Sequence, residues 1–338
     1  MTKETSNMRT IVYGAGAVGS VIGAHLFQSG RQVVLIARGA HLDAIRQHGL
    51  RLCTPEEDVR LPIAAVAHPR ELTFRDDDIV LLTMKTQDTE AALQDLQEAA
   101  GTDVPVVSCQ NGVENERLIA RRFARSYAML SWVPATYLEP GTVRCEGMPL
   151  SAILPVGRYP EGTDATAERL ASELAGARMF SSAEPRVMDM KYAKLLFNLG
   201  NGVQAITGEN DRDDAGRALS RRMRDEALRC FEAAGIRWTS DQAYAALMAR
   251  SGTAPIAGQA RAGGSTWQSL MRGGSVEVDY LNGEITLLGR LHGIPTPANA
   301  TVQRVCSAMA AAGEKPGRYT AAELLAFTDR ASAPSSLG

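Results

Sequence analysis

Near the start of the chain the sequence reads TIVYGAGAVGSVIGAHLFQSG, from Thr10 to Gly30. A short apolar segment, Thr10–Tyr13, is followed by the pattern G-x-G-x-x-G and then by an amphipathic segment that ends at Gly30. This order predicts a strand, a tight turn and a helix, which together form the phosphate-binding unit of a dinucleotide-binding domain. The pattern alone is weak, but its place between a strand and a helix makes it informative.

Each glycine of this pattern has its own physical reason. Gly14 permits the tight turn, Gly16 lets a pyrophosphate approach the backbone, and Gly19 lets the helix pack closely on the sheet. The unpaired N–H groups of the helix N-terminus then attract the negative charge of the diphosphate. A glycine-rich turn with a purely structural role is the alternative. The candidate cofactor-binding residues here are Gly14, Ala15, Gly16, Ala17, Val18 and Gly19.

The residue after the second predicted strand, Gln32–Ala37, bears on which dinucleotide is bound. An NAD site usually has an aspartate or glutamate near this point, where it accepts hydrogen bonds from the ribose hydroxyls. This chain has no acid there and carries Arg38 instead. Because a guanidinium pairs well with a phosphate, Arg38 favours NADP(H) through its 2′-phosphate. A solvated Arg38 with no role is the alternative.

Strand-like and helix-like segments alternate through the first half of the chain, which predicts an α/β fold with a doubly wound, mainly parallel sheet. Helical periodicity dominates after Pro185. We therefore expect an NADP-binding Rossmann domain over residues 8–184 and a mostly α-helical substrate and catalytic domain over residues 185–330. Single helices are expected over Val187–Ile206 and Ser275–His292, a strand over Val59–Val66, and a mobile loop over Ser251–Ser265, which is rich in glycine.

Composition excludes several classes of function. The 338 residues are 45% hydrophobic and 22% charged, as in a globular protein with two cores, and the net charge of −2 provides no broad basic field for nucleic acid or lipid. No apolar run reaches the ~18 residues that a membrane span needs. The 5 cysteines are scattered with no C-x-x-C pair, which argues against a disulfide framework or a metal site. We expect a cytoplasmic protein without a metal.

Lys194 and Asn198 are four residues apart in a predicted helix, so their side chains share one face. The residues around them are mostly apolar. A lysine that has lost part of its hydration gives up its proton more readily, which suits an acid catalyst. A lysine that merely reaches solvent is the alternative.

A second candidate region begins at Ser265 and continues with the stretch EVDYLNGE, Glu277–Glu284. The stretch predicts a helix with acids in its first turns. Because the helix dipole favours negative charge there, a structural role is the alternative to a functional one.

Taken together, these segments resemble the ketopantoate reductases (2-dehydropantoate 2-reductases) over nearly the whole chain. Their order and spacing are more specific than any one segment. The matching segments are Gly14–Gly19, Ala37–Arg38, Thr83–Lys85, Gln110–Gly112, Lys194–Asn198, Ser265, Glu277–Glu284 and His292–Pro297.

The resemblance implies an NADPH-dependent oxidoreductase that acts on CH–OH groups and reduces a 2-keto acid to a 2-hydroxy acid. Ketopantoate, an intermediate of pantothenate biosynthesis, is the first candidate substrate. The resemblance implies that Lys194 is the general acid, which protonates the carbonyl oxygen while hydride arrives at carbon. It further implies that Glu277 holds the substrate hydroxyl and orients Lys194.

The resemblance also supplies binding residues and an architecture. It implies a Rossmann domain followed by a mostly helical domain, with the active site between them. The expected partner is a small 2-keto acid, with no nucleic acid and no membrane, and the formation of a homodimer is left open. The implied substrate-binding residues are Asn111, Asn198 and Ser265, and the implied cofactor-binding residues outside the glycine turn are Arg38, Lys85 and Asn111.

Two positions depart from the family pattern. Gly202 stands where the family often has a second asparagine, with Asn201 one place earlier, and Ser269 stands where the family often has aspartate. Both positions belong to the expected substrate side. A related NADP-dependent dehydrogenase with another carbonyl or hydroxy substrate therefore remains an alternative, as does a non-catalytic dinucleotide-sensing protein.

Overall fold

The structure is a computed structural model that describes residues 8–137, 139–208, 213–257 and 263–332. The described residues form two compact units. The first holds the chain up to Lys191 together with residues 240–257, and the second holds Tyr192–Thr239 and the described residues from 263 onward. The division therefore falls inside a helix, α6 (Val187–Asn198), and one later segment returns to the first unit. The expected domain boundary at residues 184 and 185 stays a prediction.

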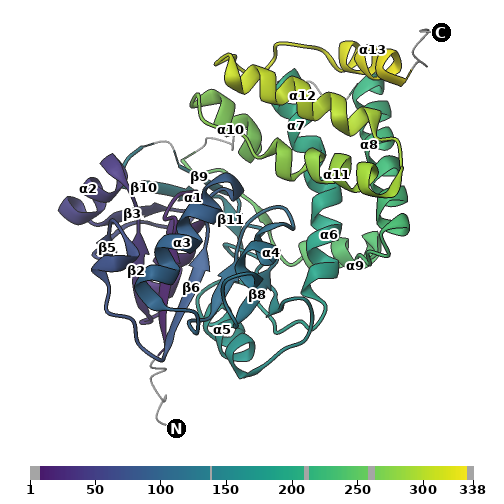
Figure 1. The fold of residues 1–338 in the computed structure, drawn as a ribbon. Helices are drawn as coiled ribbons and strands as arrows, with labels where there is room; N and C mark the ends of the chain where they lie inside the picture. The colour runs from purple at the N-terminus through teal and green to yellow at the C-terminus, as the bar shows by residue number, and fades with distance from the viewer. Residues whose placement is uncertain (1–7, 138, 209–212, 258–262, 333–338) are drawn as a thin grey trace. The chain divides into compact units, whose positions relative to one another are not determined.

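A seven-stranded sheet forms the centre of the first unit (Figure 1). All of its pairings are parallel except the one at the β12 edge, so the predicted doubly wound, mainly parallel sheet is confirmed. Side chains that alternate along the strands enter two separate hydrophobic clusters, as expected for a sheet covered on both faces. The strand order is β12 (Val156–Arg158), β8 (Ser126–Met129), β7 (Val106–Ser108), β6 (Asp78–Leu82), β1 (Arg9–Tyr13), β2 (Gln32–Ile36) and β5 (Ala64–Val66).

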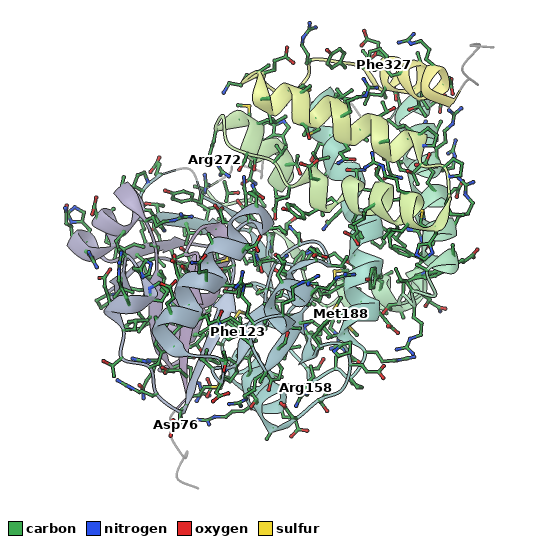
Figure 2. All side chains as sticks on the ribbon, in the orientation of Figure 1. Asp76, Phe123, Arg158, Met188, Arg272 and Phe327 are labelled. Carbon is green, nitrogen blue, oxygen red and sulfur yellow. The ribbon has the colours of Figure 1, made fainter. Side chains whose placement is uncertain are left out.

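Helices and a smaller sheet cover the two faces. Helix α1 (Ala17–Gln28) packs against both β1 and β2 and also against the smaller sheet. On the other face, Phe123, labelled in Figure 2, joins the buried cluster that contains Leu93 and Ile119. The other helices of this unit are α2 (Gly39–His48), α3 (Thr89–Ala100), α4 (Asn115–Ala120), α5 (Ala165–Ala175) and α9 (Asp241–Met248), with short 3-10 turns η1 (Pro69–Glu71) and η2 (Thr86–Asp88).

The smaller sheet has the order β4 (Asp58–Leu61), β3 (Leu50–Cys53), β10 (Thr142–Cys145) and β9 (Ala135–Thr136). Strands β3 and β4 pair antiparallel across the turn at residues 54–57. The predicted strand Val59–Val66 is wrong as one element, because it divides at Pro62, which lacks an N–H, and its second half joins the large sheet as β5.

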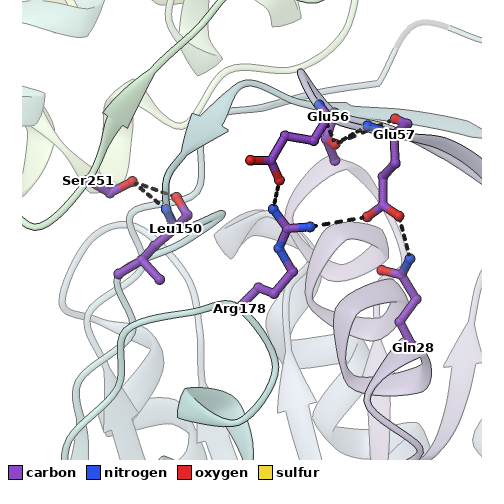
Figure 3. A network of polar contacts seen from close by, with 7 residues as sticks. Gln28, Glu56, Glu57, Leu150, Arg178 and Ser251 are labelled. Carbon is purple, nitrogen blue, oxygen red and sulfur yellow. Dashed lines mark hydrogen bonds and ion pairs between the residues drawn. The ribbon is translucent and has the colours of Figure 1, made fainter.

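A polar network fixes the turn between β3 and β4 (Figure 3). The guanidinium of Arg178 forms ion pairs with Glu56 and Glu57, and Gln28 Nε2 donates to Glu57 Oε2 at 3.0 Å. Because Gln28 is the last residue of α1, the network ties this turn to the end of that helix.

The segment 251–257 is held by the first unit and is not an open loop. Ser251 Oγ donates to Leu150 O at 2.6 Å and accepts from Leu150 N at 3.2 Å (Figure 3). Strand β13 (Gly252–Thr253) pairs with β11 (Gly147–Met148). Residues 251–257 of the expected loop therefore contain a short strand, the expected mobility of this segment stays a prediction, and residues 258–262 lie outside the described part of the chain.

The second unit is helical among its described residues. Two expected helices, Val187–Ile206 and Ser275–His292, are each interrupted, because Leu199 separates α6 from α7 and the non-helical backbone of Leu281 separates a 3-10 turn from α11. None of the described helices is long and apolar enough to cross a membrane. The elements are the end of α6, then α7 (Gly200–Thr207), α8 (Asp214–Ala233), α10 (Ser265–Met271), η3 (Val278–Tyr280), α11 (Asn282–His292), α12 (Pro297–Ala311) and α13 (Ala321–Ser332).

Candidate active site

The glycine-rich turn connects β1 to α1, as predicted, and its glycines differ in what surrounds them. Gly14 has φ +97°, and a Cβ there would lie 2.6 Å from Met84 N. A Cβ on Gly19 would lie 2.8 Å from Val12 Cγ1. These two glycines are therefore required by the packing of the chain itself.

Gly16 is different, because a Cβ on it would meet nothing closer than Gly14 O at 3.9 Å. Packing within the chain does not explain a glycine here, whereas a ligand that approaches the backbone does. Gly16 is also the N-cap residue of α1, and because glycine has no side chain, it leaves the N–H groups at the start of the helix without a side-chain cap. The turn therefore fits the diphosphate of a dinucleotide, which would accept from the N–H groups at the start of α1.

A relay of hydrogen bonds that the sequence did not reveal supports this turn. Gly141 N donates to His41 Nδ1 at 2.9 Å, so the neutral ring carries its proton on Nε2, which lies 3.3 Å from Ser20 Oγ. Ser20 Oγ in turn donates to Ala15 O at 3.0 Å. Burial lowers the pKa of His41, which keeps the ring neutral and the direction of the relay fixed.

Arg38 is the N-cap residue of α2 and lies just beyond the carboxyl end of β2. Its side chain is 79% exposed, and its Nη2 lies 3.8 Å from Asp88 Oδ1, close to the limit of an ion pair. The guanidinium is therefore accessible to a ligand phosphate.

The other candidates in the first unit lie on the same edge of the sheet. Lys85 follows β6 as the N-cap residue of η2, and Asn111 lies in the loop after β7. Gln110 Nε2 donates to Met84 O at 2.9 Å, which joins these two loops. Because β7, β6, β1 and β2 are neighbours and parallel, the structure brings the glycine turn, Arg38, Lys85 and Asn111 to the carboxyl edge of the strands, where open α/β sheets bind their ligands.

A buried ion pair beneath this edge was not predicted. Lys191, on α6, pairs with Glu116, on α4, and their side chains are 3% and 0% exposed. A lysine among mostly apolar helix residues indicates a buried functional group, and this reasoning was applied to Lys194 and not to Lys191.

In the second unit, Lys194 and Asn198 lie on α6 as predicted, and both are partly buried. Asn201 Nδ2 lies 3.4 Å from Asn198 Oδ1, so the asparagine that stands one place early contacts the candidate site residue. Asn282 Nδ2 donates to Leu199 O at 3.2 Å, at the point where α6 gives way to α7.

Ser265 and Glu277 both belong to segments that pack around α7. Ser265 is the first residue of α10, and the preceding residue, Gly264, donates its N–H to Gln204 Oε1 at 2.9 Å. Glu277 is the N-cap residue of η3 rather than a helical residue, since α11 begins only at Asn282. The segment of Ser265 thus contacts α7 through Gly264, and Val278, next to Glu277, lies beside Gly202 of α7, whereas Lys85 and Asn111 belong to the first unit.

The two positions that depart from the family pattern, Gly202 and Ser269, both lie in the interior of the second unit. A Cβ on Gly202 would lie 2.7 Å from Val302 Cγ1 and 3.1 Å from Asn282 Oδ1. Ser269 is buried, and its Oγ donates to Ser265 O at 2.9 Å. Neither position offers a side chain that points freely toward a ligand.

A parallel sheet with a diphosphate-binding turn, together with a helical unit that carries a lysine and polar amides, defines the class of dinucleotide-dependent oxidoreductases. Residues 10–158 match the family described as Ketopantoate reductase PanE/ApbA, and residues 186–310 match that family's C-terminal region. The chain therefore belongs to the ketopantoate reductase family, and the predicted family is confirmed.

Individual relatives agree with this assignment. A 2-dehydropantoate 2-reductase of Mesorhizobium japonicum is 31% identical over 319 residues, which cover 86% of this chain and 94% of the relative. The crystal structure of a PanE/ApbA family ketopantoate reductase from Ralstonia eutropha has a TM-score of 0.76 at 28% identity and covers 90% of this chain and 99% of that one. The structure of a D-mandelate dehydrogenase with NADH and anilino(oxo)acetate has a TM-score of 0.78 at 23% identity, with the same coverage, and shares the fold.

Proposed function

We propose that this protein uses NADPH to reduce a 2-keto acid to a 2-hydroxy acid, with ketopantoate as the first candidate substrate. Membership of the ketopantoate reductase family supports the reaction class. The observation that carries the proposal is the glycine turn, where Gly16 has no packing reason to be glycine and where the neighbouring strand ends in Arg38.

The preference for NADPH rests on the residues after β2. The carboxylate that would accept from the ribose hydroxyls of NAD is missing from Ala37 and Arg38, and an exposed guanidinium stands there instead. A 2′-phosphate would give this guanidinium a charged partner. NADH is bound in a D-mandelate dehydrogenase with this fold, so the fold alone does not select NADPH, and we assign the choice of dinucleotide to these side chains.

The chain would supply a proton and substrate contacts, while the bound nicotinamide supplies the hydride. Hydride addition places negative charge on the carbonyl oxygen of the substrate. The ammonium of Lys194 would stabilise that charge and donate a proton to the oxygen. Glu277 would accept from the substrate hydroxyl and orient Lys194.

The remaining site residues would hold the substrate and the cofactor. Asn111, Asn198 and Ser265 offer amide and hydroxyl donors to the substrate, and Lys85 would lie beside the cofactor. Asn201, which contacts Asn198, would orient its side chain.

The proposal is tested by NADPH oxidation with ketopantoate and a series of branched 2-keto acids, repeated with NADH. We expect turnover with at least one 2-keto acid and a higher kcat/KM with NADPH than with NADH. Because Gly202 is buried and has no side chain for a substrate, a keto acid other than ketopantoate is the second candidate, and the substrate series distinguishes the two. Tight NADPH binding without turnover on any keto acid would instead support a dinucleotide-sensing protein.

A further inference from the structure

We propose that Lys191 is a positioning residue for the reaction, because its ion pair with Glu116 fixes the two loops that carry Lys85 and Asn111. The proposal rests on the function proposed above and adds a residue to it. It concerns contacts within the first unit only.

The ammonium of Lys191 is fully engaged by acceptors of the chain. Lys191 is 4% exposed. Its Nζ donates to Ser108 Oγ at 3.3 Å, to Gln110 O at 3.0 Å and to Glu116 Oε1. An ammonium has three donors, so this set uses all of them. Lys191 is therefore held in one place and has no proton left for a substrate, which separates its role from that of Lys194.

Glu116 depends on this contact. The residue is fully buried, and among the described residues its Oε2 has no hydrogen-bond partner. A buried carboxylate without a partner is strongly unfavourable, so the charge of Glu116 requires the charge of Lys191.

The network continues from Gln110 into the loop that carries Lys85. Gln110 O accepts from Lys191, while Gln110 Nε2 donates to Met84 O at 2.9 Å and to Thr89 Oγ1 at 2.8 Å. The carbonyl immediately before Lys85 is thereby fixed relative to the loop after β7.

A second branch returns to Asn111. Thr89 Oγ1 donates to Asn115 Oδ1 at 2.8 Å, and Asn115 Nδ2 lies 3.1 Å from Thr86 Oγ1 and 3.3 Å from Asn111 O. The carbonyl of a candidate substrate-binding residue is therefore held by the same network.

Stability alone does not account for this arrangement. A buried ion pair stabilises a fold little better than an apolar pair of similar volume, whereas it fixes geometry through directed hydrogen bonds. The bonds end on the two loops at the carboxyl edge of the sheet.

The test replaces the pair by apolar residues in the double variant Lys191→Met/Glu116→Leu, which leaves no buried charge alone. We expect an unfolding midpoint close to that of the wild type, a Kd for NADPH raised ~10-fold and a kcat lowered ~10- to 100-fold, because small displacements at a reaction site carry costs of this size. A folded double variant whose Kd and kcat both stay within about twofold of the wild type would overturn the proposal.

A matched control is a second buried ion pair, between Arg9 and Asp78. Arg9 Nη2 lies 2.6 Å from Asp78 Oδ2 at the starts of β1 and β6, the opposite edge from the candidate site. Arg9→Met/Asp78→Leu should leave the Kd for NADPH and kcat unchanged. Equal loss of kcat in both double variants would contradict a specific role for Lys191.

A second variant serves if the double variant does not fold. Gln110→Met carries no change of charge and removes the bonds to Met84 O and Thr89. We expect it to raise the Kd for NADPH, and an unchanged Kd in this variant counts against the proposal. A wild type that binds NADPH but reduces no keto acid contradicts the proposed function. Because NADPH binding is measured without a substrate, the Kd values of the variants would still test the role of Lys191 in that case.

Discussion

Lys191 and Lys194 lie nearly one turn apart on α6, and their surroundings give them different roles. The ammonium of Lys191 is taken up by Ser108, Gln110 and Glu116. Lys194 is only partly buried and shares a helix face with Asn198. These contacts and burial therefore distinguish Lys191, which is proposed to position the loops, from Lys194, which is proposed to act on the substrate.

Replacement of Lys194 tests the proton donor. Lys194→Ala should lower kcat by ~10²- to 10⁴-fold, the usual contribution of a positioned acid, while the Kd for NADPH stays near the wild-type value. Steady-state kinetics and NADPH fluorescence titration measure the two quantities. Wild-type turnover in this variant would remove Lys194 from the mechanism.

Replacement of Arg38 tests the choice of dinucleotide. Arg38→Ala should lower kcat/KM for NADPH by roughly 10-fold or more, because a charged hydrogen bond to a phosphate is lost, and should leave kcat/KM for NADH nearly unchanged. Arg46→Ala is the matched control, since Arg46 is another exposed arginine of α2 and pairs with Glu71. A wild-type preference for NADH would contradict the role given to Arg38.

At the scale of the element, α7 contains two glycines with opposite surroundings. A Cβ on Gly202 would press against Val302, whereas a Cβ on Gly200 would meet nothing within 4 Å. Gly202→Ala should therefore lower the free energy of unfolding by about 1–3 kcal/mol through overpacking. Gly200→Ala should leave it unchanged or raise it by up to about 1 kcal/mol, because alanine favours the helix.

Urea unfolding of the two variants measures this difference. Since both substitutions add one methyl group to the same helix, the comparison removes the effect of helix propensity. Equal stability of the two variants would show that the packing of α12 on Gly202 is looser than described.

The elements that were predicted correctly depend on neighbours in the sequence. The strand, glycine turn and helix of residues 10–30 follow from local rules, and the structure has β1 and α1 there. At the break between α6 and α7, Leu199 O accepts a hydrogen bond from Asn282, 83 residues away, which no local pattern contains. Helix α2 was missed, and with it the contact of His41 to Gly141, 100 residues further on.

The candidate site shows the same limit. The residues at the carboxyl edge of the sheet were found because motifs and the family resemblance mark them. Glu116 and Lys191 were missed because they are 75 residues apart and belong to no motif. Their partnership is visible only when α4 and α6 are placed against β7.

At the scale of the whole molecule, burial of a single histidine links stability to pH. His25 lies on α1, is 2% exposed, and burial lowers its pKa to about 4, helped by the charge of Arg178. The unfolded chain takes up this proton near pH 6.5, but the folded protein does so only near pH 4. The stabilisation from a neutral His25 is therefore complete above pH 6.5 and is lost as the pH falls toward 4.

The expected loss is on the order of 3 kcal/mol between pH 6.5 and 4. Chemical denaturation at several pH values within this range measures it. In His25→Leu the decline over the same range should be clearly smaller, although that variant starts from a different stability. An identical decline in both proteins would assign the pH dependence to other groups.

The return of residues 240–257 to the first unit has a consequence for how the protein is made. Strand β13, which pairs with β11, and Ser251, whose hydroxyl donates to Leu150 O, both follow α7 and α8 of the second unit in the sequence. The chain must be synthesised through residue 257 before the described parts of its nucleotide-binding unit are all present. The two units are thus interleaved in the sequence, and no single cut of the chain would give both of them whole.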